Sequence, residues 1–358
     1  NFQRISTIFL KIYKIPMIRL NANENFYGCS GKVISAMRNK LKDVNFYPDF
    51  NPISLENELA GKLNVTRENI VIGAGSVRII DGIIQTFCAN QNDEIITFEN
   101  SFSAYHQLAG AYNRKYIFAK QENFICRLKN IFPLLNKNTK VIFLANPNNP
   151  TGTIITHDEL NEFMKRLPSP VLMVVDEAYC EYVCDTRFPD SVSLLKKYPN
   201  LIIARTFSKA YGLAGLRIGY AIAHKKNIHN LKKTRIPYSI NYLSETAAKV
   251  ALSDRAFIKK CCADNDKERK ILFDSLVKSG YNALESQANF IYVYFASEEE
   301  KEIIFKKLFD SNILVCNMKI FEQEKCLRIG VGDRKTNKMI LKCLTSPQPL
   351  SKMERGEK

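Results

Sequence analysis

The sequence predicts an α/β protein with a large domain, built around a mostly parallel mixed sheet, and a smaller C-terminal α/β domain. Short apolar runs alternate with longer amphipathic stretches from Met17 onward, which is the order that places helices between parallel strands. The chain has 358 residues, of which 46% are hydrophobic, and this is enough to bury more than one core.

Six apolar runs in the first part of the chain are expected to form buried strands of the large sheet. They cover residues 69–73, 94–98, 140–145, 171–176, 201–205 and 218–222. Several of these runs end in a charged or hydroxyl side chain. Because ligands bind at the carboxyl ends of the strands in open α/β sheets, we expect the functional residues at these ends.

The rest of the chain is expected to form the smaller domain. Residues 244–280 contain few helix breakers and carry apolar residues at three- and four-residue spacing, which predicts helix. Candidate strands follow at residues 289–295, 314–316 and 327–331. We therefore expect an N-terminal segment and a large domain over residues 17–237, and a small domain over residues 238–345.

The two ends of the chain are expected to lie outside these domains. Residues 1–16 contain an apolar run that Lys11 and Lys14 interrupt and no small-residue cleavage site, so we expect an extension rather than a signal peptide. Residues 346–358 lack apolar periodicity and are expected to be disordered. No apolar run approaches the roughly 18–20 residues that span a bilayer, so no membrane segment is expected.

Composition narrows the classes of function. The 52 basic and 36 acidic residues give a net charge of +16, but the excess is dispersed, which favours anionic small ligands over nucleic acid. The ten cysteines are scattered, which indicates a reducing, cytoplasmic location. None of the four histidines lies at metal-ligand spacing to a cysteine pair, so no metal site is expected.

A carboxylate and a lysine lie at the ends of two predicted strands. Asp176 ends the run at 171–176, where a buried carboxylate needs a cationic or proton-bearing partner; a helix N-cap or a buried ion pair is the alternative explanation. Lys209 follows the next strand, eight residues before Arg217. Desolvation beside a cation lowers the pKa of a lysine. A lowered pKa is what an amine needs in order to bond to an aldehyde. An ordinary surface lysine is the alternative.

Candidate phosphate-binding groups lie close by in the sequence. Thr206, Ser208 and Arg217 supply two hydroxyls and a planar guanidinium, although helix capping and a surface ion pair would use the same residues. Gly75 and Ser76 follow a strand and open a helix, so their amides could bind a phosphate, with a plain tight turn as the alternative. Together these residues supply a carboxylate to pair with a pyridinium nitrogen, a lysine amine to bond to an aldehyde, and hydrogen-bond donors for a phosphate. A pyridoxal-phosphate site needs these groups.

Five segments connect these groups with a known family. They are Leu-Asn-Ala-Asn-Glu-Asn at 20–25, Tyr-Pro-Asp at 47–49, Asn-Pro-Asn-Asn-Pro-Thr-Gly at 146–152, Asp-Glu-Ala-Tyr at 176–179, and residues 205–220. In these segments the chain resembles fold type I pyridoxal-phosphate enzymes, the aspartate aminotransferase superfamily, and most closely the histidinol-phosphate aminotransferases. The resemblance covers residues 17–342.

The resemblance implies a role for each cofactor-site residue. Lys209 would bind the cofactor covalently and move a proton at the substrate Cα, while Asp176 would keep the ring nitrogen protonated. Asn149 and Tyr179 would hydrogen-bond the phenolic oxygen of the cofactor. Phe102 would stack on the ring, although an ordinary core residue could fill this position. The cofactor phosphate would be held by Thr206, Ser208, Arg217 and the amides of Gly75 and Ser76.

Four further residues match family positions outside the cofactor site. Tyr47 matches the tyrosine that such enzymes send to the cofactor phosphate of the neighbouring subunit, which implies a homodimer with composite sites. Arg328, in Cys-Leu-Arg-Ile-Gly, matches the arginine for the anionic group of the substrate, with a surface arginine as the alternative. Asn23 and Tyr27 match positions that line the substrate side.

Two departures from the family pattern lie near the expected cofactor. Phe26 replaces the proline of an Asn-Glu-Asn-Pro turn, which alters the entry loop. Val77 and Arg78 replace an Asp-Glu pair and so reverse the charge at the start of a helix. A cation there is unfavourable to the helix dipole but could help to bind an anion.

A third departure concerns the substrate. Cys316 stands where histidinol-phosphate enzymes carry an arginine that helps to bind the substrate phosphate. Losing one charge-assisted contact costs about 1.5–3 kcal/mol, or roughly 10- to 150-fold in affinity. Either Arg78, Arg235 or Lys319 substitutes for this arginine, or the substrate is a different, smaller phosphorylated or carboxylated compound.

The predicted function is a homodimeric, pyridoxal-phosphate-dependent aminotransferase of the histidinol-phosphate type. It would transfer an amino group from glutamate, in a ping-pong mechanism, to a small phosphorylated keto compound such as imidazole acetol phosphate or dihydroxyacetone phosphate. The alternative is a decarboxylase of phosphoserine or phosphothreonine, which needs the same cofactor site. A regulatory protein without turnover is disfavoured by the intact Lys209, Asp176 and Arg217, and no helix-turn-helix segment supports DNA binding.

Overall fold

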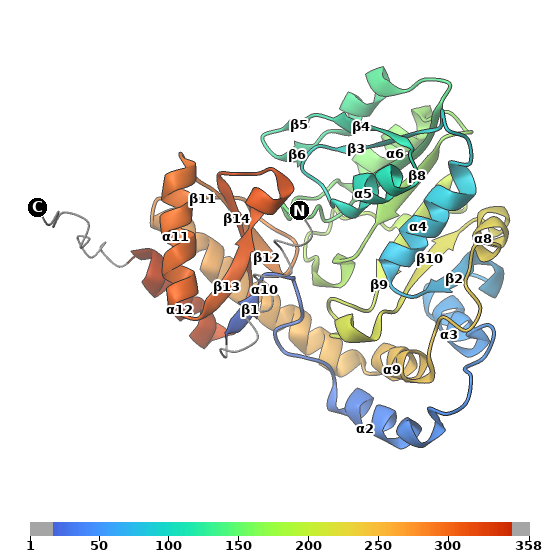
Figure 1. The fold of residues 1–358 in the computed structure, drawn as a ribbon, viewed down its shortest axis with the longest axis horizontal. Helices are drawn as coiled ribbons and strands as arrows, with labels where there is room; N and C mark the ends of the chain where they lie inside the picture. Colours follow the sequence, from blue (N-terminus) through green and yellow to red (C-terminus); the bar gives the residue numbers. More distant parts are fainter. Residues whose placement is uncertain (1–16, 346–358) are drawn as a thin grey trace, which may run out of the picture.

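A computed structural model describes residues 17–345 and shows two main sheets with helices packed on them, together with a separate two-stranded sheet (Figure 1). The larger sheet has seven strands in the order β2-β10-β9-β8-β7-β3-β4, and the smaller has five in the order β1-β13-β14-β12-β11. The predicted α/β fold class is therefore confirmed. The predictions for residues 1–16 and 346–358 concern parts of the chain outside the described residues.

The large sheet contains all six predicted strands. They are β2 (Ile70–Gly73), β3 (Glu94–Phe98), β7 (Thr139–Ala145), β8 (Leu172–Asp176), β9 (Leu201–Thr206) and β10 (Gly219–Ala223). Strand β10 runs antiparallel to both β2 and β9, and the other neighbouring pairs are parallel. The sequence did not reveal the edge strand β4 (Lys115–Ala119), because only Ala119 of its five residues is buried. The sheet is thus mixed and mostly parallel, as predicted.

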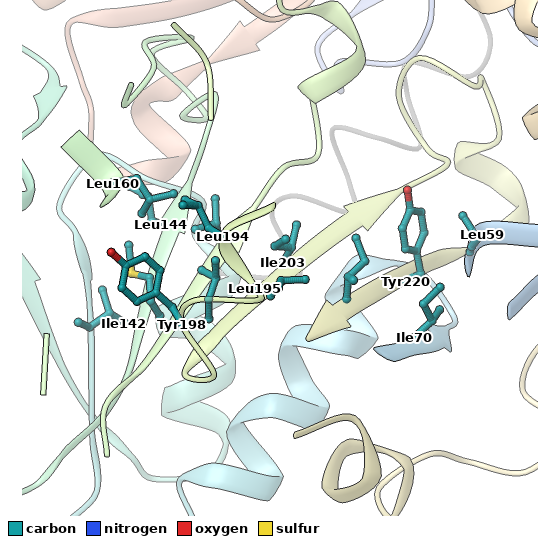
Figure 2. Close-up of a cluster of buried hydrophobic side chains, with 14 of the residues drawn as sticks. Leu59, Ile70, Ile142, Leu144, Leu160, Leu194, Leu195, Tyr198, Ile203 and Tyr220 are labelled. Carbon is teal, nitrogen blue, oxygen red and sulfur yellow. The ribbon is translucent and has the colours of Figure 1, made fainter. Parts of the chain in front are cut away.

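Helices cover both faces of the large sheet. On one face, α4 (Ser76–Phe87), α5 (Ala104–Ala111) and α8 (Lys225–Lys232) contribute to one buried cluster. On the other face, α3 (Ile53–Leu63), α6 (His157–Arg166), α7 (Ser191–Leu194) and α9 (Tyr242–Ser253) contribute to a second cluster, part of which Figure 2 shows. Neighbouring strand residues such as Ile202 and Ile203 alternate between the two clusters. Burial on both faces explains why these strands are continuous apolar runs.

The small sheet is mainly antiparallel. Its strands β12 (Phe290–Tyr294), β13 (Ile313–Asn317) and β14 (Cys326–Gly330) match the three predicted strands and pair antiparallel. The two-residue β11 (Asn282–Ala283) extends one edge. At the other edge β1 (Ile18–Leu20) runs parallel to β13. The N-terminal segment, which the prediction grouped with the large domain over residues 17–237, therefore adds a strand to the small sheet.

The predicted helical stretch at 244–280 is two helices rather than one. Helix α9 ends at Ser253. The backbone of the next residue, Asp254, leaves the helical region, and α10 (Arg255–Lys278) follows. The Asp254 carboxylate accepts hydrogen bonds from Ser30 Oγ at 2.5 Å and Lys32 Nζ at 3.0 Å, which connects this break to the start of α2 (Gly31–Lys40). Helix α9 packs on the large domain, and α10 runs from there to the small sheet (Figure 1). The boundary at residues 237 and 238 stays a prediction.

Further elements complete the small domain and connect the two domains. Helices α11 (Glu298–Asp310) and α12 (Arg334–Thr345) cover the small sheet. A hairpin of β5 (Gln121–Glu122) and β6 (Ile125–Cys126) extends from the large domain, and the Phe124 ring at its tip lies 5.5 Å from Tyr292 and 5.2 Å from Tyr294. Among residues 17–345 no helix has the length and apolar character to cross a membrane.

Candidate active site

A cavity of about 350 Å³ lies at the carboxyl ends of β7, β8 and β9, between the large sheet and the small domain. Parallel register places these strand ends side by side, with Ala145 of β7 opposite Asp176 of β8. Most of the candidate residues line this cavity. They are Asn23, Ser76, Phe102, Asn149, Asp176, Tyr179, Thr206, Ser208, Lys209, Arg217 and Arg328.

Asp176 is a buried carboxylate with one satisfied oxygen. Its Oδ2 accepts a hydrogen bond from the Tyr105 hydroxyl at 3.0 Å, and the Tyr105 ring stacks on Phe143. Its Oδ1 is buried and has no hydrogen-bond partner. Burial raises the pKa of Asp176 to about 6. The free Oδ1 atom can therefore accept a hydrogen bond from a protonated group of a ligand in the cavity.

Lys209 lies in the turn after β9 and faces the same cavity. Its Nζ donates to the carbonyl of Ala22 at 2.9 Å and lies 5.6 Å from the centroid of the Tyr179 ring. Burial, and after it the nearby guanidinium of Arg328, lower the pKa of this amine to about 7. A large fraction of the amine is therefore unprotonated at neutral pH, the form that attacks a carbonyl.

Side chains from three distant segments position the groups around Lys209. The buried Tyr179 hydroxyl accepts a hydrogen bond from Asn23 Nδ2 at 2.9 Å. Asn149 Oδ1 accepts one from Arg328 Nη1 at 2.5 Å, and Arg328 Nη2 donates to the carbonyl of Asn21 at 2.7 Å. These contacts connect the N-terminal segment, the large domain and the small sheet across the cavity.

A group of donors forms one end of the cavity. The Thr206 hydroxyl donates to Ser208 Oγ at 2.9 Å, and Arg217 Nη1 lies 3.4 Å from the same Ser208 oxygen. The first turn of α4 begins beside them, at Ser76. Gly75 has a φ of +85°, and a Cβ there would lie 2.5 Å from Arg217 Nη2. Glycine is therefore required at residue 75 to admit the guanidinium next to the helix N-terminus.

These residues fit pyridoxal phosphate. The unpartnered Asp176 Oδ1 would accept the proton of the ring nitrogen, and Lys209 would supply the amine for the aldehyde. Thr206, Ser208, Arg217 and the start of α4 would bind the phosphate, because hydroxyl, guanidinium and helix N-terminal amide donors all suit an anion. When bound, this cofactor supplies an electron-accepting ring that stabilises negative charge at the substrate Cα.

Three predicted site residues are not among those that line the cavity of this protomer: Gly75, which directly precedes the lining residue Ser76, Tyr47 and Tyr27. Tyr47 is 80% exposed, and its ring lies 5.1 Å from that of Tyr238. Tyr27 was expected on the substrate side, but it lies beside the acidic side chains of Asp264, Glu268 and Asp333. Burial, followed by these carboxylates, raises the pKa of Tyr27 to about 12. Glu24 is the last residue of this segment that lines the cavity, and the expected role of Tyr27 on the substrate side stays a prediction.

The three cations considered as substitutes for the missing arginine lie elsewhere. Arg78 Nη1 donates to Asp81 Oδ2 at 2.7 Å, and Arg235 lies 3.8 Å from Glu56 Oε1. Both line a separate small hollow. Lys319 forms an exposed ion pair with Glu298. Within the described residues, the cations that line the cavity are therefore Lys209, Arg217 and Arg328.

Three residues that contribute to the site were not predicted. Tyr105 holds Asp176, and it lies in the segment that contains Phe102. Met318 and Phe321, in the short 3-10 helix η6 (Met318–Phe321), line the substrate side from the small domain. No charge or spacing signal distinguishes them from core residues, so the sequence could not have revealed them.

Comparisons with known proteins agree with this geometry. The family model for aminotransferase class I and II matches residues 15–344. A histidinol-phosphate aminotransferase from Caldicellulosiruptor saccharolyticus is 37% identical over 328 residues, which are 92% of this chain and 91% of the relative.

Two solved structures resemble this chain over most of their length. Histidinol-phosphate aminotransferase from Sinorhizobium meliloti, in complex with pyridoxal-5'-phosphate, has a TM-score of 0.85 and 26% identity over 92% of this chain and 90% of its own. L-threonine-O-3-phosphate decarboxylase from Porphyromonas gingivalis has a TM-score of 0.79 and 20% identity over 92% of this chain and 98% of its own, which shows a shared fold alone. The predicted resemblance is confirmed: the chain belongs to the class I and II aminotransferase family and is a pyridoxal-phosphate-dependent aminotransferase.

Proposed function

We propose that this aminotransferase transfers an amino group from glutamate to a small phosphorylated keto compound, such as imidazole acetol phosphate or dihydroxyacetone phosphate. One observation carries the proposal: a lysine amine, a buried carboxylate and one guanidinium outside the cofactor's phosphate-binding group face a single cavity. Relatives that are named histidinol-phosphate aminotransferases, at 34–37% identity over about nine-tenths of the chain, support this class of substrate.

Each residue contributes a distinct step. Lys209 takes a proton from the substrate Cα and returns one, which its lowered pKa permits at neutral pH. Asp176, oriented by Tyr105, holds the proton of the cofactor ring nitrogen. Arg328, fixed by Asn149 and the Asn21 carbonyl, orients the anionic head group of the substrate so that its Cα faces Lys209.

The visible spectrum of the purified holoenzyme tests the proposal. Glutamate alone should remove the visible absorbance of the lysine-linked cofactor and release one 2-oxoglutarate per site, and the phosphorylated keto compound should restore the absorbance. If glutamate leaves the spectrum unchanged while phosphoserine or phosphothreonine releases carbon dioxide, the decarboxylase alternative replaces this proposal.

We further propose a homodimer in which Tyr47 reaches the neighbouring site, with the cytosol as its compartment. An exposed aromatic group supports the dimer: the side chains of Phe46, Tyr47, Phe50 and Tyr238 are 64%, 80%, 54% and 47% exposed. Solvent exposure of a contiguous group of large apolar side chains is typical of a protein interface. The cytosol is reducing, which suits ten cysteines that are all free thiols.

Complementation between two defective variants tests the shared site. Lys209→Ala removes the amine and Tyr47→Ala removes the tyrosine, so each homodimer should be impaired. In mixed dimers one site combines Lys209 from one subunit with Tyr47 from the other. Mixing by unfolding and refolding together should restore at most about a quarter of the wild-type activity, because random pairing leaves one intact site in half of the dimers. No recovery above the two separate variants would refute the shared site.

A further inference from the structure

The β5–β6 hairpin of the large domain contacts the small domain. Its two strands are joined by Asn123 and Phe124, and the ring centroid of Phe124 lies 5.5 Å from that of Tyr292 and 5.2 Å from that of Tyr294. Both tyrosines belong to β12 of the small sheet. Figure 1 shows the hairpin extending from the large domain toward the small domain. The Phe124 ring is therefore a contact between the two domains.

The backbone at Phe124 is unfavourable for a phenylalanine. Asn123 and Phe124 have φ values of +51° and +64°. Two positive φ values in a two-residue hairpin turn are typical of type I′, which prefers glycine at its second position. A bulky residue with a positive φ is uncommon, and it persists where surrounding contacts hold it. Because the turn alone would favour glycine at residue 124, the phenylalanine indicates that its ring is needed for the contact outside the turn.

The Phe124 ring packs on the apolar cluster behind the small-domain wall of the cavity. Tyr292 and Met318 are buried members of this cluster, and Phe321 packs against it together with Phe124. Met318 and Phe321 also line the cavity. The Tyr292 hydroxyl donates to Gln323 Oε1 at 2.6 Å, and the Gln323 amide donates to the Met318 carbonyl at 3.2 Å. A continuous chain of contacts therefore connects Phe124 with two side chains of the cavity wall.

The base of the hairpin is fixed to the large-domain side of the same cavity. The Gln121 side chain donates to the Asn100 carbonyl at 3.1 Å, and Asn148 Nδ2 donates to the same carbonyl at 2.8 Å. Asn100 directly precedes Ser101 and Phe102, which line the cavity. The hairpin therefore connects the large-domain side of the cavity with its small-domain wall.

We propose that Phe124 is a positioning residue for transamination, whose ring holds residues 318–323 where Met318 and Phe321 face the bound substrate. Phe124 does not itself line the cavity, so it acts through the wall that it supports. Without the ring, the wall would adopt further arrangements and the fraction of binding-competent protein would fall. The apparent dissociation constant rises in proportion to this loss. The inference rests on the proposed function where its kinetic test uses glutamate as the donor.

Phe124→Gly in the holoenzyme separates the ring from the turn. Glycine suits the positive φ, so the turn stays favourable while the ring contact is lost. KM for glutamate should rise roughly 3- to 10-fold, the factor expected for lost aromatic contacts, while kcat changes by less than about 2-fold. Phe124→Tyr keeps the ring and should keep KM within about 2-fold of the wild type. Phe309→Ala removes a partly exposed phenylalanine of α11 that does not line the cavity, and as the matched control it should also keep KM within about 2-fold.

Hydrogen exchange of the holoenzyme supplies a measurement that needs no amino donor. The backbone amides of residues 318–323 should exchange about 3- to 10-fold faster in Phe124→Gly than in the wild type, because local opening of this segment becomes more frequent. Phe309→Ala should leave their exchange unchanged.

Tyr294→Ala removes the other side of the contact and does not depend on the turn. It should raise KM for glutamate and speed exchange at residues 318–323 as Phe124→Gly does. Because the two residues act through one contact, the double variant should raise KM no further than the larger single effect.

The outcomes separate this inference from the function on which it rests. If glutamate does not convert the cofactor in the wild-type enzyme, the proposed function fails, and the exchange rates alone decide the inference. If glutamate reacts and either KM or the exchange rate at residues 318–323 stays within about 2-fold of the wild type in Phe124→Gly, the inference is overturned. A fall in kcat with unchanged KM, or single effects that multiply in the double variant, also overturns it.

Discussion

The two ends of the cavity are built from different kinds of structure. At the cofactor end, Asp176 and Thr206 end adjacent strands of one sheet whose parallel register fixes their separation. At the substrate end, Asn23, Met318 and Arg328 come from the N-terminal segment, a 3-10 helix and a strand of the small sheet. The groups for cofactor chemistry thus lie at or just beyond the strand ends of one sheet, while the groups that select the substrate depend on how three segments meet.

The largest expected effect lies at the cofactor end. Lys209→Ala removes the amine that binds the cofactor and moves the proton, so kcat for the glutamate reaction should fall by at least about 10³-fold. Single-turnover absorbance measurements with glutamate check this loss. Lys226→Ala, an exposed lysine in α8, is the matched control and should keep full activity. Unchanged turnover in Lys209→Ala would refute the role of this lysine.

At the substrate end the expected effect is smaller and falls mainly on KM. Arg328→Ala removes the charge-assisted contact with the head group, which contributes about 1.5–3 kcal/mol, so kcat/KM should fall roughly 10- to 150-fold. Arg328→Lys keeps the charge without the planar fork and should recover only part of the loss. An equal loss in kcat and kcat/KM, with KM unchanged, would contradict a binding role for Arg328.

The difference between the two ends also explains what could be predicted from the sequence. Asp176 and Thr206 could be predicted because a buried strand that ends in a polar residue is a local signal in the sequence. Met318 was missed, because its position depends on how distant segments pack and not on spacing within one segment. The break at Asp254 was missed for the same reason: it depends on contacts with Ser30 and Lys32, more than 200 residues away in the sequence.

The pH dependence of cofactor binding tests the lowered pKa of Lys209 at the cofactor end of the cavity. Only the unprotonated amine attacks the aldehyde, and burial lowers the pKa of Lys209 to about 7. The rate at which the apo protein binds pyridoxal phosphate should therefore rise about 10-fold per pH unit below pH 7 and level off above it. Stopped-flow absorbance between pH 5.5 and 9 measures this profile. A rate that still rises about 10-fold between pH 8 and 9 would indicate a lysine with the ordinary pKa near 10.4.

The smallest expected effects come from the cations that face away from the cavity. Lys319 is paired with Glu298, and Arg78 is bound by Asp81 and the Thr234 carbonyl, so neither is available to the head group in this protomer. Lys319→Ala and Arg78→Ala should each change KM for the phosphorylated acceptor by less than about 2-fold, as expected for changes outside a binding contact. Steady-state kinetics with both variants measure the two effects. A rise of more than about 10-fold for Arg78→Ala alone would mean that Arg78 binds the head group across a subunit interface, because its own cavity is out of reach, and the substrate end would then contain a second guanidinium.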